Sequence, residues 1–341
     1  MTADQTTELG LLEQTARDIL RDVAGEDPAK AWRLLTEAGL PLLAVPEPEG
    51  GGWLGAAAVV ARLVGESGAE LPYGDAAMVA APILAAAGLP LRAGIAVAAY
   101  DDEATVTRAG DGLRLRATLS RVPWGAVAEQ VVVVARGENG DVVVAVDPSS
   151  AEVTHGRNIA GEPRDTLRVD GVVDAVADAP DGIRDELLRR GALARAVAMA
   201  GAADAALRTS VRYATERVQF GRPIAKQQAV QHLLAEAAAE VEAMRAAADA
   251  AVLVCAEDGF LGQRALVSVA TAKAQGGASA EVVARLAHQV HGAIGTTREH
   301  PLHRVTLRLW SWRDDFGSER HWQQVLGELA LEADPWQLVT A

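Results

Sequence analysis

One repeating pattern of apolar residues, between positions 230 and 252, limits what this chain can fold into more than any other feature. Apolar side chains recur there at spacings of three and four residues, at Val230, Leu233, Ala237, Val241, Met244, Ala248 and Val252. That spacing places them on one face of a single long helix that packs in a bundle. A turn at residues 219–223 precedes this helix, and another strongly helical run precedes the turn. Arg, Gln and backbone amides at a helix start can hold an anionic group such as a pyrophosphate.

The chain divides into three regions by the period of its apolar residues. Residues 1–93 have a helical pattern, whereas residues 94–176 alternate with a period of two, and Asn139-Gly140 marks a hairpin turn between two valine-rich strands. Residues 177–341 return to the helical period. The four long helical runs of that region lie near 183–217, 224–256, 262–292 and 318–331. The predicted fold is therefore α+β, with an N-terminal helical domain, a small antiparallel β middle domain and a C-terminal four-helix bundle.

Composition and charge exclude several classes of protein. A net charge of −14 over 341 residues disfavours nucleic acid and anionic membrane surfaces as partners. The N-terminus lacks the basic start and apolar core of a signal peptide, and no apolar run reaches the ~20 residues of a membrane span. The one cysteine, Cys255, favours a buried structural role in a reducing compartment. We therefore expect a soluble, cytoplasmic protein with no nucleic-acid and no membrane partner.

Three segments, in this order, resemble landmarks of the acyl-CoA dehydrogenase family. They are AWRLLTEAGLPLLAVPEPEGGGW (31–53), RVQFGRPIAKQQAVQHLLAE (217–236) and AKAQGGASAEVVARLAHQVHGAIGTTREHPLHR (272–304). The resemblance covers the N-terminal and C-terminal regions well and the middle region poorly. It implies a flavoenzyme that removes two hydrogens from the Cα–Cβ bond of an acyl-CoA, with FAD bound at a subunit interface.

The resemblance also implies which residues contact the cofactor. In the family, one subunit's middle domain holds the isoalloxazine, and the neighbour's C-terminal bundle holds the ADP half of FAD. The matching positions here are Arg217, Gln219, Phe220, Gln228, Gln289, Gly292 and Ala293. The first three match contacts to the diphosphate and adenosine, Gln228 matches an added amide contact, and the last three match the adenine side. An Arg suits this role because its planar fork binds phosphate oxygens in pairs.

Both positions that hold the family's catalytic base lack a carboxylate in this chain. One position, before the last bundle helix, is occupied by Phe316, and the other, in the first bundle helix, is occupied by Gly191. Neither residue can abstract a proton, so no catalytic residue is predicted. Asp314 and Asp315 adjoin the first position, but acidic residues on a loop are more often solvated or paired, here with Arg313.

The part of the family pattern that holds the flavin ring is also degraded. The family's T-E-P-x-x-G-S-D loop has no match between Ala93 and Val173, and Leu119–Ala135 is a decayed match to its W-I-T strand, with Pro123-Trp124 in place of those residues. A partner chain would then supply the flavin cradle, the acyl-CoA pocket and the base. In this respect the chain resembles the smaller, base-lacking subunit of actinobacterial α2β2 steroid side-chain acyl-CoA dehydrogenases.

Four histidines form the pattern H-x2-H…H-x2-H, at His288, His291, His300 and His303. The spacing superficially suggests a metal site. A Gly-rich turn separates the two pairs, however, and no carboxylate or Cys completes a recognised zinc pattern. We therefore predict no metal site and interpret these residues as surface or interface histidines.

Three hypotheses about function follow from these patterns. The first is a subunit of a heteromeric, FAD-dependent dehydrogenase that acts on an acyl-CoA such as a steroid side-chain thioester. The second is a complete homo-oligomeric acyl-CoA dehydrogenase with a displaced base such as Asp315. The third is a flavin-free scaffold that only stabilises a partner. Under all three hypotheses, the predicted domains are residues 1–93, 94–176 and 177–341.

Overall fold

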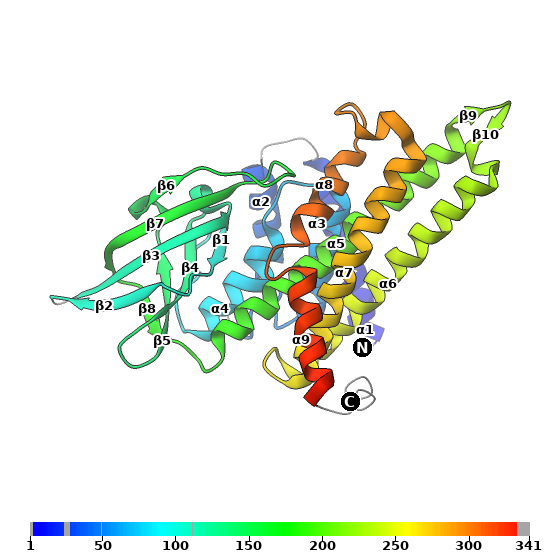
Figure 1. The fold of residues 1–341 in the computed structure, drawn as a ribbon. Helices are drawn as coiled ribbons and strands as arrows, with labels where there is room; N and C mark the ends of the chain where they lie inside the picture. Colours follow the sequence, from blue (N-terminus) through cyan, green and yellow to red (C-terminus); the bar gives the residue numbers. More distant parts are fainter. Residues whose placement is uncertain (1–2, 24–27, 49, 111, 333–341) are drawn as a thin grey trace. The chain divides into compact units, whose positions relative to one another are not determined.

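The chain has a mixed α+β fold, as predicted (Figure 1). The residues that the computed structural model describes are 3–23, 28–48, 50–110 and 112–332. Contacts divide the chain into two compact units, to both of which α3 (Leu54–Ser67) and α5 (Ile183–Glu216) contribute. The first unit comprises Met1–Val60 and Glu70–Gly191, and the second comprises Ala61–Ala69 and Ala192–Ala341.

The N-terminal helices of the first unit each bury an apolar face. They are α1 (Ala3–Asp22), α2 (Pro28–Glu37), the first part of α3, a π-helical segment (Gly74–Ala80) and α4 (Ala81–Ala86), which continues from it. In α1, Ala16 and Leu20 are buried at a spacing of four, and in α2 Trp32 and Leu35 are buried at a spacing of three. These spacings confirm the helical pattern of the N-terminal region.

The sheet of the first unit has the strand order β6-β7-β3-β2-β4-β5-β8, with β1 paired to β4. Its strands are β1 (Ala96–Ala99), β2 (Thr105–Ala109), β3 (Gly112–Pro123), β4 (Gln130–Arg136), β5 (Asp141–Val146), β6 (Glu152–Thr154), β7 (Arg164–Val173) and β8 (Val176–Asp178). In β3, Leu115, Ala117 and Leu119 are buried while Arg116 and Thr118 are exposed. This alternation and the β4–β5 hairpin were both expected from the sequence.

The sheet is mixed, which corrects the expectation of a wholly antiparallel one. β1 runs parallel to β4, with Ala96 opposite Gln130 and Ala99 opposite Val133. Parallel strands need a crossover connection, and the β2–β3 hairpin lies within the connection from β1 to β4. The pairings of β3 with β2 and β7, and of β5 with β4 and β8, are antiparallel. Periodicity does not reveal β1, because its four residues are small and all buried.

The second unit is helical. Besides the later part of α5 it contains α6 (Gln228–Asp258), α7 (Gln263–His291), α8 (Leu302–Trp312) and α9 (Glu319–Glu332). The predicted stripe on α6 is confirmed for its central part, where Ala237, Val241, Met244, Ala248 and Val252 are buried. Cys255 is also buried on this helix. None of the helices among the described residues is long and apolar enough to cross a membrane.

Helix α8 lies between the third and fourth predicted helical runs, and the sequence pattern does not predict it. Its buried face includes Val305, Leu309 and Trp312, but also Arg308, which is only 2% exposed. A guanidinium on the buried face interrupts the apolar stripe that identifies an amphipathic helix. Up to residue 332, the C-terminal region therefore has one more α-helix than the four that were expected.

Two glycines allow α3 and α5 to approach closely within the second unit. A Cβ atom on Gly201 would overlap the carbonyl oxygen of Arg62, and one on Gly65 would overlap the carbonyl oxygen of Ala198. Since each obstacle is a backbone atom, neither can move aside by changing a rotamer. The crossing of these two helices thus depends on glycine at both positions.

We expect Gly201→Ala to lower the free energy of unfolding by about 1–3 kcal/mol, because the added methyl group overpacks the helix crossing. Denaturant unfolding of the whole chain measures this. Gly327→Ala on α9 is the matched control, since nothing lies within 4 Å of its added Cβ. The control should leave stability unchanged or raise it by up to about 1 kcal/mol. Equal effects of both substitutions would contradict the close approach of α3 and α5.

Candidate functional site

A short hairpin carries the first group of predicted cofactor residues. Strands β9 (Val218–Gln219) and β10 (Arg222–Pro223) pair with Gln219 opposite Arg222. The two residues between them, Phe220 and Gly221, have φ angles of 53° and 77°. Positive φ at both central residues is what a type I′ turn requires. For Phe220 this conformation costs about 1–2 kcal/mol, so the fold holds a non-glycine residue there against its preference.

The hairpin is tied to the end of α5 and presents its side chains to solvent. The amide of Arg217 donates to the carbonyl oxygen of Tyr213 at 2.8 Å, and the amide of Ile224 donates to the carbonyl oxygen of Arg217 at 2.9 Å. The Phe220 side chain is 92% exposed. A large aromatic residue at the tip of a fixed turn is suited to insertion into another molecule.

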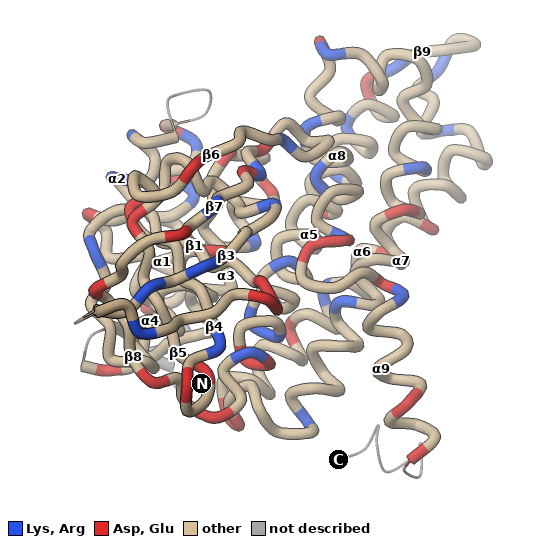
Figure 2. The backbone as a smooth tube through the Cα atoms, turned by 60° about the vertical axis from the view of Figure 1, so that its left-hand side comes forward, with Lys and Arg blue, Asp and Glu red and all other residues tan. Residues whose placement is uncertain are grey.

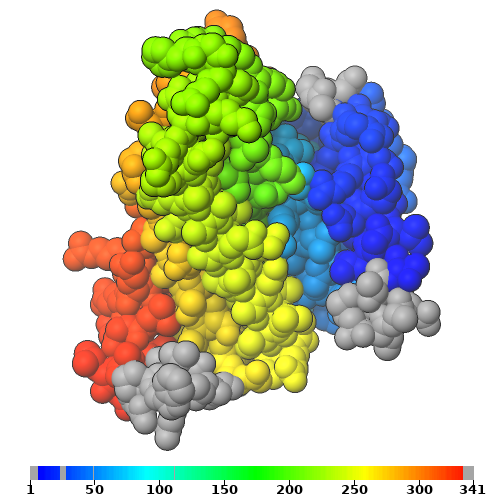
Figure 3. Space-filling model, turned by 90° about the vertical axis from the view of Figure 1, so that its right-hand side faces the viewer, coloured from blue at the N-terminus to red at the C-terminus, as the bar shows by residue number. Residues whose placement is uncertain are grey.

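All seven residues implied as FAD contacts lie at one end of the second unit. Each of them is exposed: Arg217, Gln219, Phe220, Gln228, Gln289, Gly292 and Ala293. The ends of α5 and α7 meet there, because the ring of Tyr213 stacks on that of His291 with centroids 4.5 Å apart. The start of α6 joins them, since Leu233 lines the same small cavity as Val290. Figure 3 shows the hairpin and the start of α6 projecting at this end, in green.

The donors at this end suit an anionic nucleotide. Arg217 supplies a guanidinium, and Gln219, Gln228 and Gln289 supply amides. Gly292 ends α7 with a φ of 64°, and nothing lies within 4 Å of where its Cβ would be. Figure 2 shows basic residues near the β9 hairpin, although the chain as a whole is acidic. The chemistry of these residues is thus compatible with the ADP part of FAD, whose phosphates a guanidinium such as that of Arg217 would hold.

The position of the missing base is part of a closed loop between α8 and α9. Phe316 is half-buried and has a φ of 54°. Its carbonyl oxygen accepts a hydrogen bond from Trp322 Nε1 at 3.0 Å, and the guanidinium of Arg195 lies 5.7 Å from its ring centroid. The other base position, Gly191, is buried within α5. Neither position offers a proton acceptor.

Two buried cations hold this loop in place. Arg195 Nε donates to Asp315 Oδ2 at 3.0 Å, and the two side chains are only 6% and 11% exposed. Lys273 Nζ donates to the carbonyl oxygens of Arg313 and Gly317 at 2.6 and 2.7 Å. Burial lowers the pKa of Lys273 to about 7, while the charge of Asp315 acts in the opposite direction. Sequence reasoning missed Arg195 and Lys273, although a charged residue within an apolar helical run is a usable signal.

The acidic residues beside Phe316 differ sharply in their surroundings. Asp314 is exposed, whereas Asp315 is held by Arg195. Arg313, the expected partner of both, lies instead 3.3 Å from Glu281 and 3.7 Å from Glu319. Asp315 is therefore engaged by a cation from α5.

In the middle region, the residues that stand in place of the family's W-I-T run, Pro123 and Trp124, are buried. Trp124 is only 7% exposed and has a φ of 55°, and its carbonyl oxygen accepts hydrogen bonds from the amides of Val127 and Ala128 at 3.1 and 3.0 Å. Asp165 is also buried and accepts from the amide of Ala126 at 2.9 Å. In this arrangement Trp124 is a packing residue that caps a turn.

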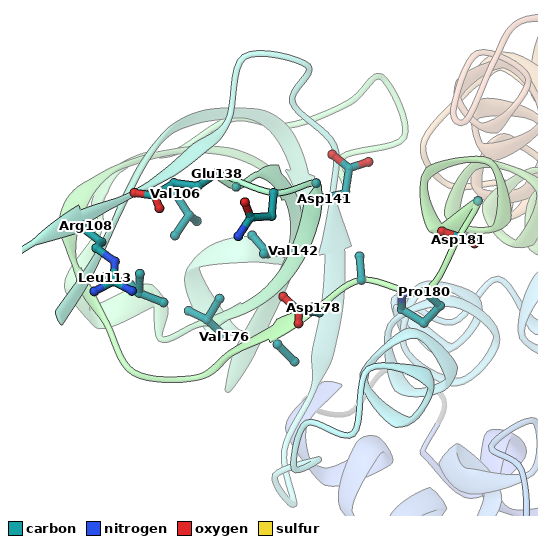
Figure 4. Close-up of a pocket in the computed structure, with 16 residues that line it drawn as sticks. Val106, Arg108, Leu113, Glu138, Asp141, Val142, Val176, Asp178, Pro180 and Asp181 are labelled. Carbon is teal, nitrogen blue, oxygen red and sulfur yellow. The ribbon is translucent and has the colours of Figure 1, made fainter.

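A polar groove of about 780 Å³ opens elsewhere in the first unit, between the β2–β3 hairpin, the β4–β5 turn and the segment before α5 (Figure 4). Its ionisable lining residues are Arg108, Glu138, Asp141, Asp178 and Asp181. Arg184 binds Asp141 through two hydrogen bonds of 2.7 and 2.9 Å, and this lowers the pKa of that carboxyl. The seven predicted cofactor residues belong to the second unit and do not line the groove.

The histidines form contacts with rings and backbone atoms. His291 is 4% exposed, so the expectation of a surface residue is wrong for it. His288 Nε2 lies 3.0 Å from Thr306 Oγ1, and His303 Nδ1 lies 2.7 Å from the carbonyl oxygen of His300. Within the described part of the chain, no group of three or more His, Cys, Asp or Glu residues is arranged to hold a metal ion.

Comparisons with known proteins agree with this fold and with these motifs. A family model described as the acyl-CoA dehydrogenase C-terminal domain matches residues 183–312. The chain is 33% identical over 311 residues to acyl-CoA dehydrogenase FadE27 of Mycobacterium tuberculosis, with 81% of each chain covered. It is 30% identical over 283 residues to acyl-CoA dehydrogenase IpdE2 of the same organism, with 80% of this chain and 77% of IpdE2 covered.

Two solved structures share the fold over nearly the whole chain. The ChsE4–ChsE5 complex from Mycobacterium tuberculosis contains a chain with a TM-score of 0.84 and 24% identity, covering 98% of this chain and 99% of that one. A variant of the Tcur3481–Tcur3483 steroid ACAD matches with a TM-score of 0.82 and 27% identity, covering 96% and 98%. The architecture is that of an acyl-CoA-processing oxidoreductase. The chain belongs to the acyl-CoA dehydrogenase family.

We expect Asp315→Asn to lower the free energy of unfolding by about 3–5 kcal/mol, because it leaves the buried Arg195 guanidinium without its counter-charge. Denaturant unfolding measures the change. Asp314→Asn, one residue away and exposed, should alter stability by no more than about 0.5 kcal/mol. If the two substitutions have the same small effect, the ion pair does not hold the loop.

Proposed function

We propose that this chain is one subunit of a heteromeric, FAD-dependent acyl-CoA dehydrogenase. It supplies the contacts to the ADP side of FAD, and a homologous partner supplies the flavin cradle, the acyl-CoA pocket and the catalytic Glu. The observation that carries the proposal is an asymmetry within the second unit. The residues matched to the ADP contacts are all exposed at one end, whereas the loop matched to the base is closed around Phe316.

The exposed end has the chemistry to hold the cofactor of another chain. Bound FAD supplies a hydride acceptor for the substrate Cβ. Arg217 binds phosphate oxygens, and the amides of Gln219 and Gln228 contribute neutral hydrogen bonds to the diphosphate and adenosine. Gln289 and the open backbone at Gly292 and Ala293 accept the adenine side. Phe220 then becomes buried when the partner covers the hairpin.

The closed loop weighs against a complete enzyme with Asp315 as its base. A general base must reach the proton it removes, but the Asp315 carboxylate is 11% exposed and hydrogen-bonded to Arg195. Freeing it would break an ion pair between two buried side chains, which is costly. Proton abstraction is therefore assigned to the partner.

Similar proteins support a heteromer and suggest a substrate class. One similar structure is a complex of two named components, ChsE4 and ChsE5, and another is a steroid ACAD named as the pair Tcur3481–Tcur3483. By this likeness we assign the chain to an α2β2 heterotetramer that desaturates a steroid side-chain CoA thioester. Such a heterotetramer would act in steroid and cholesterol catabolism.

We expect Arg217→Ala to weaken FAD binding by the co-expressed complex by about 10- to 100-fold, since hydrogen bonds to charged groups contribute about 1.5–3 kcal/mol each. Quenching of flavin fluorescence on titration measures the dissociation constant. Arg245→Ala is the control, because Arg245 is an exposed arginine on α6 paired with Glu242. It should change FAD affinity by less than about threefold.

Two results would contradict the proposed role as a cofactor-binding subunit of a heteromer. Unchanged FAD affinity in the Arg217→Ala complex would favour a scaffold subunit with no cofactor contact. Flavin-containing, active protein from this chain expressed alone would favour a complete homo-oligomeric enzyme.

A further inference from the structure

Three rings connect the two segments that carry the proposed FAD contacts. The Tyr213 ring stacks on His291 with centroids 4.5 Å apart and planes 26° apart. His300 meets His291 edge-on at 4.6 Å and Tyr213 edge-on at 6.2 Å. We refer to Tyr213, His291 and His300 as the ring cluster. Since it joins the end of α5 to both sides of the α7–α8 turn, it fixes Arg217 and Gly292 within one rigid group.

The turn that carries Gly292 is packed directly against His291. A Cβ on Gly295 would lie 2.7 Å from His291 Cβ and 3.3 Å from Leu302 Cδ2, so the backbone at Gly295 lies in van der Waals contact with that histidine. Gly295 is itself buried. The position of the turn from Gly292 to Gly295 thus depends on the position of the His291 ring.

Hydrogen bonds and burial favour neutral imidazoles at His291 and His300. His291 Nδ1 lies 2.8 Å from the carbonyl oxygen of Ala287, which can only accept, so Nδ1 carries the proton. His291 Nε2 is buried and has no hydrogen-bond partner among the described residues. The amide of Leu302 donates to His300 Nδ1 at 3.2 Å, so that nitrogen carries no proton.

The neighbouring groups whose charge acts on the two histidines of the ring cluster are all basic side chains. On α5, the charge of Arg212 acts on His300; on α7, His288 acts on His291; and at the start of α8, His303 acts on His300. Burial lowers the pKa of His291, and the hydrogen bond to Ala287 only partly opposes this. Burial likewise lowers the pKa of His300. A proton on His291 would be repelled by positive charge on His300 or His288, and it would leave the new Nε2–H donor buried with no acceptor among the described residues.

We propose that the neutral ring cluster positions the two halves of the FAD half-site, and that protonation of His291 disrupts it, so that this chain holds the cofactor at neutral pH and releases it in acid. This proposal rests on the FAD half-site proposed above. Because folding depresses the pKa of His291 below the ordinary 6.5, the cluster is fully stable above that pH. Its stability is lost as pH falls from 6.5 towards the folded-state pKa.

The test is the FAD dissociation constant of the co-expressed complex at about pH 7.5 and about pH 5.5, the range in which histidines titrate. For the wild type we expect affinity to fall several-fold and by no more than about tenfold, since one proton taken up with a pKa below 6.5 cannot weaken binding further by about pH 5.5. His291→Phe keeps a ring but cannot be protonated. It should bind within about threefold of the wild type at the higher pH and lose most of the pH dependence. His232→Phe, an exposed histidine on α6, should keep the wild-type pH dependence.

A second pair of variants separates positioning from folding. Tyr213→Ala removes the stacked ring and should weaken FAD binding at both pH values, whereas Tyr213→Phe should restore wild-type behaviour. Circular dichroism at each pH reports whether the helices remain folded, and light scattering reports whether the complex stays assembled. Dissociation of the wild-type complex in acid that His291→Phe does not prevent would overturn the proposal.

The outcomes also separate this proposal from the one on which it rests. If FAD affinity of the wild type is constant across the pH range, or if His291→Phe retains the pH dependence, the ring cluster is not the switch. If Arg217→Ala still weakens binding in that case, the half-site itself stands. If Arg217→Ala has no effect, the half-site fails, whatever the histidine variants do.

Discussion

The second unit depends on two buried basic side chains that join its helices at one point. Lys273 on α7 holds the carbonyl oxygens of Arg313 and Gly317, and Arg195 on α5 holds Asp315. These contacts link α5 and α7 to the loop between α8 and α9. Buried charges are stable only when paired and hydrogen-bonded, so the loop has little freedom to move. Its conformation places Phe316, with its unfavourable positive φ, where the family has its base.

The opposite end of α7 lies beside exposed residues. His291 lies 18 residues after Lys273, which corresponds to about 27 Å along a helix. There Phe220 is exposed at the tip of its hairpin, Ile294 is exposed in the α7–α8 turn, and that turn is open at Gly292. One helix thus connects the loop that contains Phe316 to the exposed end that carries the proposed FAD contacts. That division is what a chain needs if it completes the cofactor site of a partner and carries no reaction centre of its own.

Much of the fold follows from local patterns that the sequence displays directly. The stripe on α6, the alternation in β3 and the β4–β5 hairpin all have one strong period or turn signal, and the structure confirms them. The parallel pairing of β1 with β4 has no such signal, because β1 is short and buried on both faces. The sequence pattern does not predict helix α8, because Arg308 lies on its buried face and interrupts the apolar stripe.

The sequence predicts the motif residues of the candidate site but not the contacts that support them. The resemblance to the family names Arg217, Gln219 and Gly292, since these lie in short continuous segments. The Arg195–Asp315 pair joins residues 120 positions apart, and Tyr213 and His291 are also distant in sequence, so no local pattern links them.

The central claim is that the named residues contact FAD. Hydrogen–deuterium exchange of the co-expressed complex with and without FAD tests it most directly. If these residues contact FAD, the cofactor will protect backbone amides at 217–224 and 292–297 and leave those at 313–317 unchanged. Protection at 313–317, with none at the hairpin, would contradict it.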